Sequence, residues 1–367
     1  MPGESAEVSC EGTEEDGVAT QPEKEPAESL QARWKDEVMA ELAAHPFQPP
    51  WWLRNAHAQT VGARYVRGLK KPAMRVERWD TPDDDFLDLH FLEGSNDMPT
   101  ALLLHGLEGS IESTYFQGLI LELARNDWNV VAMEFRTCSG EINRAKRMYH
   151  SGETSDLAWV VDQLIARRPD IELYLAGFSL GGNVTAKWFG ESGGALPPNV
   201  KAGAVVSAPY DLVVSGIHMD NSISRLYVLH FIRKLMRKVV EKDKQYPGVL
   251  DVERLKRART FKDFDDYATA PLHGFKDAHD YYTSVACGQF LEGIRRPTLL
   301  LSSADDPFNP GETLPYDLAE RHPYLHPLFT DRGGHVGFIP RGWRRGLGCW
   351  SEEQIVRFFQ AYRQRLR

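Results

Sequence analysis

Residues 171–188 read IELYLAGFSLGGNVTAKW, and they give the clearest indication of fold in the 367-residue chain. The first half alternates apolar residues as a short buried strand does, and the residues after Gly181 have the character of a helix. Between them lies a G-x-S-x-G pattern, from Gly177 to Gly181, with Ser179 at its centre. A serine on a tight strand-to-helix turn has its hydroxyl exposed at the edge of a sheet, where it can act as a nucleophile. This stretch therefore predicts an α/β fold with Ser179 as the nucleophile.

The segments around this stretch predict a mostly parallel sheet with helices on both faces, because strand-like and helix-like patterns alternate along the chain. Two strands around the turn at 81–85 form an expected antiparallel hairpin at the sheet edge. Further strands are expected at 101–104, 130–133, 202–207, 297–303 and 325–330, and helices at 114–126, 155–167 and 352–366.

The alternation stops for about eighty residues after Pro209, where only helical patterns occur. A helical insertion after the nucleophile is typical of a cap over the edge of the sheet where ligands bind. We therefore predict an α/β core at 75–208 and 289–367 and a helical cap at 209–288. Residues 31–74 are predicted to form a helix and an extended arm, and residues 1–30 a disordered acidic tail.

Composition excludes several classes of protein. The net charge is −9, but nine acids and one lysine in residues 1–30 contribute −8 of it, which leaves the rest of the chain at about −1. A nearly neutral folded part gives no support for nucleic-acid binding. No apolar run is long enough to span a membrane, and the acidic N-terminus is unlike a secretory signal. The four scattered cysteines (Cys10, Cys138, Cys287, Cys349) indicate reduced thiols in a cytoplasmic protein. No motif indicates a metal or another cofactor.

Two further side chains are expected to act with Ser179. A pair of carboxylates, Asp305 and Asp306, directly follows the strand at 297–303, and His335 lies on a glycine-rich loop after the last strand. The order Ser, Asp, His is the one expected when a catalytic triad is built on such a sheet. Pattern alone does not separate the two carboxylates. We select Asp306, because the Asp-Pro-x-x-Pro turn directs it away from the strand end.

His105 is the main rival to His335, since it ends the first parallel strand in the segment HGLEG. A His-Gly pair at this place usually shapes a loop that supplies a backbone N–H to an oxyanion hole. We therefore assign His105 a structural role and predict the N–H groups of Leu107 and Leu180 as the oxyanion donors. His326 and Asp331 match an H-x-x-x-x-D spacing, but His326 falls within a predicted strand, so we attribute that match to coincidence.

The chain resembles the α/β-hydrolases, and more narrowly their YheT-like branch. The resemblance covers roughly residues 45–365. It rests on Gly-Phe-Ser-Leu-Gly-Gly and on PWWLRNAHAQT (50–60), HGLEGS (105–110), FRTCSGEINR (135–144), YHSGETSDL (149–157), DDPF (305–308) and GGHVGF (333–338). It implies carboxyl-ester hydrolysis with Ser179, Asp306 and His335 as the triad, in a branch that includes lipid esterases and medium-chain ester-forming acyltransferases. The acidic tail is not part of this pattern.

Two segments allow more than one interpretation. Residues 222–244 form a basic amphipathic pattern, which suits either a cap helix that leaves its bases in water or a weak contact with an anionic membrane surface. We favour the cap helix, and liposome pelleting distinguishes the two. Residues 135–156 could line the pocket, but we favour a rigid loop held by hydrogen bonds of Arg136, Asn143 and Asp156.

Together these patterns predict a serine esterase for short- to medium-chain acyl esters or monoacylglycerols. Its acyl pocket is expected to be apolar, with Phe178, Phe308 and Phe338 and an aromatic-rich cap. Acyl transfer to an alcohol is the first alternative, because an acyl-enzyme also accepts alcohols. A catalytically silent fold used for binding is the alternative from another class.

Overall fold

The structure is a computed structural model that describes residues 27–70 and 72–367. Most of the predicted acidic tail, residues 1–26, therefore lies outside the described residues. The last residues assigned to that tail, 27–30, belong to helix α1 (Ala27–Ala43).

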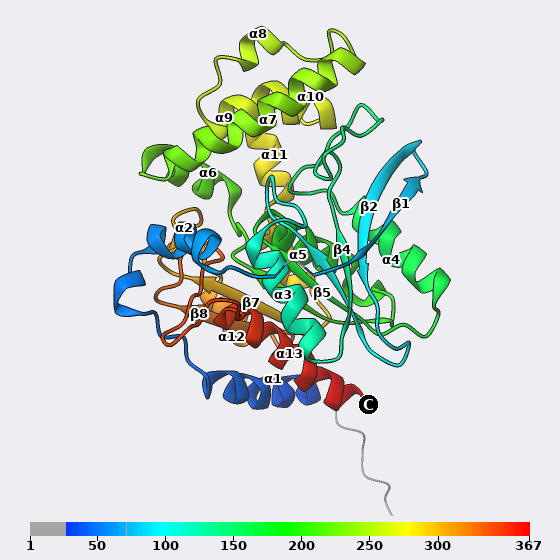
Figure 1. Cartoon of the computed structure of the whole chain (residues 1–367), viewed down its shortest axis with the longest axis vertical. Coiled ribbons are helices and arrows are strands. Elements are labelled where there is room, and N and C mark those ends of the chain that lie inside the picture. The colour runs from blue at the N-terminus through cyan, green and yellow to red at the C-terminus, as the bar shows by residue number, and fades with distance from the viewer. Residues whose placement is uncertain (1–26, 71) are drawn as a thin grey trace, which may run out of the picture.

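An eight-stranded sheet forms the centre of the molecule (Figure 1), with the strand order β1-β2-β4-β3-β5-β6-β7-β8. The strands are β1 (Arg75–Thr81), β2 (Asp85–Leu92), β3 (Thr100–Leu104), β4 (Asn129–Met133), β5 (Leu173–Phe178), β6 (Val200–Val206), β7 (Thr298–Ser303) and β8 (Leu325–Thr330). The hairpin β1–β2 is antiparallel at one edge and β2 pairs antiparallel with β4, whereas β4 to β8 pair in parallel. The α/β fold expected from the sequence is confirmed.

Helices cover both faces of the sheet, and the strands divide their side chains between the two. Alternate residues of β5 belong to different cores: Leu173 and Leu175 to one, Tyr174 and Ala176 to the other. The first core includes apolar residues of α4 (Ser155–Arg167) and α5 (Leu180–Ser192). The second includes those of α1, α3 (Thr114–Arg125) and α13 (Trp350–Leu366). Because both faces are covered, the central strands are largely apolar on both sides.

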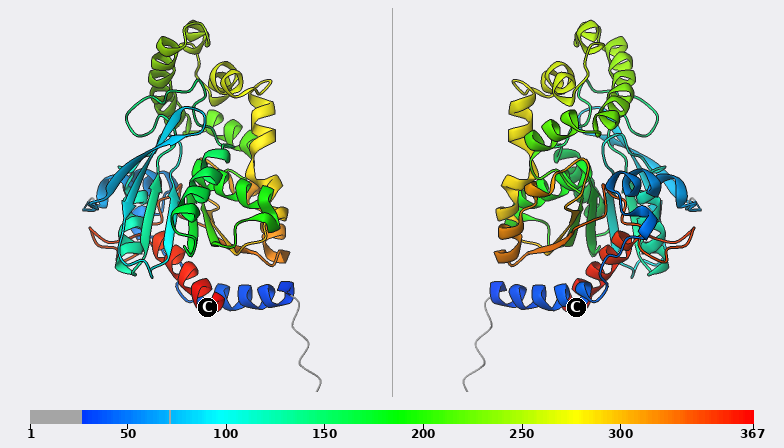
Figure 2. Two further views of the ribbon diagram at one scale, coloured as in Figure 1. Left: turned by 90° about the vertical axis from the view of Figure 1, so that its right-hand side faces the viewer. Right: turned by 90° about the vertical axis from the view of Figure 1, so that its left-hand side faces the viewer.

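A group of helices between β6 and β7 rises above the end of the sheet, as Figure 2 shows in both side views. They are α6 (Leu212–Asn221), α7 (Arg225–Gln245), α8 (Val252–Leu255), α9 (Phe261–Phe264), η3 (Asp265–Thr269), α10 (Ala270–His273) and α11 (Ala278–Val285). They have an apolar core of their own, to which α7 contributes Val228, Ile232, Leu235 and Val239.

The bases of α7 do not all lie in water, contrary to our expectation. Arg225, Arg233 and Arg237 are exposed, but Lys238 is largely buried and Lys242 is fully buried. Lysine is tolerated there because the Lys242 ammonium donates to the carbonyl oxygens of Asn143 and Ala145, each at 2.7 Å.

The segment expected to be an extended arm is helical in its second half. After η1 (Trp51–Leu53), helix α2 spans Ala56–Val66. The side chain of Asn55 caps α2 by accepting the Ala58 N–H at 3.1 Å. Asparagine is a preferred N-cap residue, so Asn55 was a signal for the start of this helix. The nearby prolines and tryptophans favoured an extended segment instead.

The remaining short elements are η2 (Gly193–Ala195), η4 (Cys287–Gly293), η5 (Gly311–Thr313) and α12 (Tyr316–Arg321). Cys138, Cys287 and Cys349 are free thiols, and Cys10 lies outside the described residues. Across residues 27–70 and 72–367, none of the helices has the length and apolar character needed to cross a bilayer. The same residues contain no cluster of three or more potential metal ligands.

Candidate active site

Ser179 occupies a tight turn between β5 and α5, as the sequence predicts. Its backbone has φ 53° and ψ −116°, a conformation that residues other than glycine rarely adopt. The turn is held by the neighbouring strand, because the Ser179 N–H donates to the Val206 carbonyl at 2.7 Å. Strained conformations of this kind persist where the surrounding structure over-determines them, and they concentrate at active sites.

The glycines around Ser179 are required by close backbone approach. A Cβ atom on Gly177 would lie 2.2 Å from the Gly181 carbonyl oxygen, and one on Gly181 would lie 2.5 Å from that of Leu104. Both distances are shorter than any tolerable contact. The G-x-S-x-G pattern is thus what allows β5, α5 and the end of β3 to meet at the serine.

Asp306 and His335 come together at the ends of β7 and β8. The His335 Nδ1 lies 2.8 Å from Asp306 Oδ2, and the second carboxylate oxygen accepts the N–H groups of Phe308 (2.8 Å) and Asn309 (3.2 Å). The Asp306 side chain is fully buried. A carboxylate fixed by three donors holds the imidazole in one orientation, with Nε2 facing away from it.

Asp305 has a different role. It is half-buried, and its Oδ1 accepts the Gly334 N–H at 2.9 Å, which braces the loop that carries His335. The structure therefore places Asp306, rather than Asp305, in contact with the imidazole.

Helix α2 supports the same loop from the other side. The Thr60 hydroxyl accepts the His335 N–H at 2.9 Å. The Gln59 side chain, fully buried, bonds the backbone of Ile339 through both its oxygen and its nitrogen. Sequence reasoning missed both positions, although the segment 50–60 had already been singled out by the resemblance.

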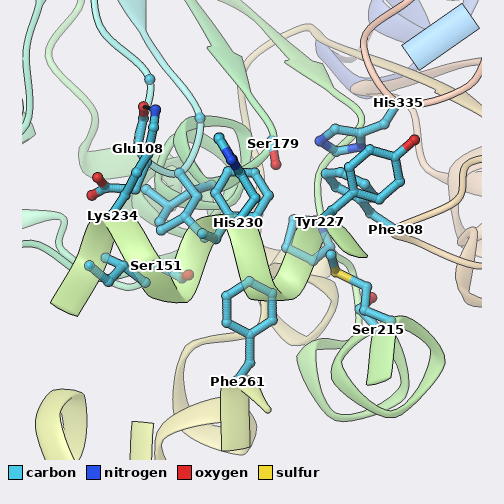
Figure 3. Close-up of a pocket in the computed structure, with 18 of the residues that line it drawn as sticks. Glu108, Ser151, Ser179, Ser215, Tyr227, His230, Lys234, Phe261, Phe308 and His335 are labelled. Carbon is cyan, nitrogen blue, oxygen red and sulfur yellow. Dashed lines mark hydrogen bonds between the residues drawn. The ribbon is translucent and has the colours of Figure 1, made fainter. Parts of the chain in front are cut away.

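Ser179 and His335 line one cavity of about 760 Å³, and Figure 3 shows them at the same end of it. The proposed oxyanion residues Leu107 and Leu180 line it as well. Leu180 is the first residue of α5, where the N–H groups of a helix have no partner within the helix. The structure thus gathers all five predicted site residues, with Asp306 reaching the cavity through His335.

His105 has no place in the lining of that cavity, and its contacts explain its role. Its Nε2 accepts the Phe135 N–H at 3.1 Å, so Nδ1 carries the proton and donates to the Gly106 carbonyl at 2.8 Å. Burial lowers the pKa of His105 to about 4, which keeps the ring neutral. The Gly109 N–H also donates to the Gly106 carbonyl, at 2.9 Å. These two donors fix the peptide group whose N–H belongs to Leu107.

The remaining cavity wall comes largely from the cap. Its aromatic members are Tyr227, Phe231, Phe261, Phe264, Tyr281 and Tyr282, and core residue Phe308 joins them. Phe308 also stacks on the His335 ring, with centroids 4.2 Å apart. The expectation for Phe178 and Phe338 was wrong, because both are buried in the second core. Phe178 faces that side because alternate residues of a strand face opposite sides of the sheet, whereas Phe338 reaches it from the loop after β8.

The loop at 135–156 serves both purposes that we considered. Arg136 is fully buried and pairs with Asp83, Asp85 and Asp156, so the loop is held rigidly, as we favoured. Residues 148–151 of the same loop nevertheless line the cavity. His326, in β8, bonds the Tyr362 hydroxyl at 2.6 Å and lies far from this chemistry in the fold.

Comparison with known proteins gives concordant results. The family model for the alpha/beta hydrolase fold matches residues 99–341. The YheT protein of Escherichia coli (strain K12) is 37% identical over 321 residues, covering 86% of this chain and 93% of its own length. A monoacylglycerol lipase of Saccharomyces cerevisiae is 30% identical, covering 77% of this chain and 62% of its own length.

A solved structure agrees with the fold. The Pyrococcus furiosus esterase Pf2001 superposes with a TM-score of 0.50 at 17% identity, covering 87% of this chain and 97% of that one. The glycine-flanked serine turn, the parallel sheet and these sequence relationships establish that the chain belongs to the α/β-hydrolase family and, within it, is YheT-like.

Proposed function

We propose that this protein is a serine hydrolase that cleaves carboxylic esters through an acyl-Ser179 intermediate. The observation that carries the proposal is the contact of 2.8 Å between His335 Nδ1 and Asp306 Oδ2, at the end of a cavity that also holds the strained Ser179 turn. Similarity to esterases and lipases of the same family supports ester hydrolysis in general.

The mechanism follows from the roles of these three groups. A serine hydroxyl is a weak nucleophile, so His335 Nε2 removes its proton as the oxygen attacks the ester carbonyl. Asp306 stabilises the imidazolium that forms. The imidazolium then protonates the departing alcohol. Water, activated by the same histidine, releases the acid and restores Ser179.

The N–H groups of Leu107 and Leu180 are proposed to bind the oxygen that becomes negative during attack. Leu107 is held by the fixed Gly106 peptide group, and Leu180 lies at the positive end of the α5 dipole. Donors fixed in advance need no rearrangement as charge develops, and losing one typically costs about 100- to 1,000-fold in rate. No cofactor is needed for these steps.

The cavity suggests the class of substrate. Its volume lies within the range of pockets that enclose small ligands, and its aromatic and aliphatic wall suits an acyl chain. We propose short- to medium-chain acyl esters or monoacylglycerols as substrates, in keeping with the yeast relative, which is a monoacylglycerol lipase. A small acyl ester is thus the proposed partner. The absence of nucleic-acid binding and the cytoplasmic location stay predictions from the sequence.

A fluorophosphonate probe tests the proposal. We expect the probe to modify Ser179 covalently, as located by peptide mass spectrometry, because phosphonylation requires a serine activated by a base. A chain-length series of p-nitrophenyl esters should then show the highest kcat/KM at short to medium acyl chains. A folded protein that neither reacts with the probe nor hydrolyses any ester of the series would leave only the binding alternative.

Acyl transfer is tested by product analysis. An acyl-enzyme partitions between water and any alcohol that reaches it, so ethanol added during turnover should yield some ethyl ester. For a hydrolase we expect free acid to dominate at low ethanol concentrations. Ethyl ester as the main product under those conditions would favour the acyltransferase alternative.

Membrane contact through the cap stays a prediction, and only a weak contact is proposed. Most of the apolar face of α7 is buried in the cap core, although Leu226 in its first turn is exposed, so mainly the exposed arginines are available to meet anionic lipid. Binding of this kind is electrostatic and should weaken with salt. Pelleting that does not respond to salt or to anionic lipid would dismiss it.

A further inference from the structure

Helix α7 of the cap reaches the core through three lysines spaced four residues apart, on one face of the helix. The Lys234 ammonium donates to the Glu108 carbonyl at 3.4 Å, and the Lys238 ammonium lies 2.5 Å from Glu108 Oε1. Lys242 instead bonds the carbonyl oxygens of Asn143 and Ala145. The helix is therefore seated on two separate loops. One of them is the turn at 106–109 that carries Leu107.

Glu108 is held on several sides. Its N–H donates to the Tyr149 hydroxyl at 2.9 Å, and that hydroxyl donates to Glu108 Oε1 at 2.8 Å. Lys238 contacts the same carboxylate oxygen, and the Glu108 side chain is only 4% exposed. Burial opposes the charge on Lys238, but Cys138 and the Glu108 carboxylate outweigh it and raise the pKa of Lys238, so the ammonium is charged at neutral pH.

The backbone of Glu108 needs this support. Its φ is +52°, in the left-handed region that is unfavourable for a residue with a side chain. Such a conformation lasts only when neighbouring groups hold it. Glu108 directly follows Leu107 within the turn that the Gly109 N–H closes on the Gly106 carbonyl. Relaxation at Glu108 would therefore change the direction of the Leu107 peptide groups.

We infer that Lys238 is a positioning residue, which couples the seating of the cap to the oxyanion hole. While α7 is in place, Lys238 holds the Glu108 carboxylate. The Tyr149 hydroxyl links that carboxylate to the Glu108 N–H. The turn held in this way presents the Leu107 N–H to the cavity. The inference rests on the proposed function, because it assigns Leu107 as a donor. Figure 3 shows Glu108 and Lys234 close together on the side of the cavity that α7 closes.

The test compares Lys238→Met with Lys242→Met in the full-length chain. Both replacements remove a buried ammonium from the same face of α7, but only Lys238 contacts Glu108. We expect Lys238→Met to accelerate amide hydrogen exchange at 106–110 and to lower kcat about 10- to 100-fold with KM nearly unchanged, as for a misplaced catalytic group. Lys242→Met should instead accelerate exchange at 143–147 and leave kcat close to that of the wild type.

Two further measurements separate positioning from general destabilisation. Lys238→Arg keeps a cation beside Glu108 and should restore most of kcat. An alkyl trifluoromethyl ketone, whose adduct with serine carries an oxyanion, should lose affinity in Lys238→Met by the same factor as kcat. Unchanged exchange at 106–110, or equal losses of kcat in the two methionine variants, would overturn the inference. Faster exchange without a loss of kcat would also overturn it while leaving the proposed function intact. An inactive wild type would instead refute the proposed function.

Discussion

Ser179→Ala is expected to abolish ester hydrolysis, with a fall in kcat of about 10⁶-fold and complete loss of fluorophosphonate labelling. The size of the effect follows from the cooperation of the triad. Without the serine hydroxyl no acyl-enzyme forms, so His335 and Asp306 cannot contribute. Only substrate binding and the oxyanion donors still lower the barrier. Steady-state hydrolysis of a p-nitrophenyl ester, with enzyme at high concentration for the variant, measures it.

Stability serves as the control for this variant. The Ser179 backbone bonds to Val206 and Asn183 involve no side-chain atom, so alanine can keep them. Alanine also faces the same left-handed strain as serine, and the thermal midpoint should change little. A variant that folds normally and retains substantial activity would exclude Ser179 as the nucleophile.

Asp306→Asn is expected to lower kcat about 10⁴-fold, the second largest effect. Asparagine preserves the shape of the side chain but offers an N–H where His335 Nδ1 now meets a carboxylate, which favours the wrong tautomer of the imidazole. The neighbouring Asp305→Asn is the matched control, because the Asp305 carboxylate accepts the Gly334 backbone N–H on the histidine loop. We expect that control to lose far less activity. Equal losses in the two variants would show that loop structure, rather than a carboxylate on the imidazole, is what matters.

The fold and the predicted site were accessible from local patterns. The buried strands, the glycine-flanked serine and the carboxylate and histidine at strand ends each lie within a few consecutive residues. The chemistry of a triad then links them. The selection of Asp306 over Asp305 agrees with the observed hydrogen bond, because the turn that follows the strand governs the direction of the side chain.

What the sequence could not supply depends on contacts between distant segments. That Phe178 and Phe338 face the second core, while Phe308 faces the cavity, depends on the register of the strands and on the path of the loops. The burial of Lys238 and Lys242 was hidden because a basic residue on an amphipathic helix usually lies in water. Their partners come from loops about a hundred residues away.

The support of the His335 loop by α2 has a consequence for how the protein is made. Thr60 and Gln59 leave the ribosome well before the loop they hold, because their partners His335 and Ile339 lie 275 and 280 residues later in the chain. Helix α1 also precedes its partners in synthesis, because its Lys35 donates to the carbonyl groups of Ala319 and His322. A growing chain therefore exposes α1 and α2 without their partners until those later segments have been synthesised. Partly folded chains of this kind are prone to aggregate or to need a chaperone. The proposed catalytic site can therefore form only after the His335 loop has left the ribosome and met α2.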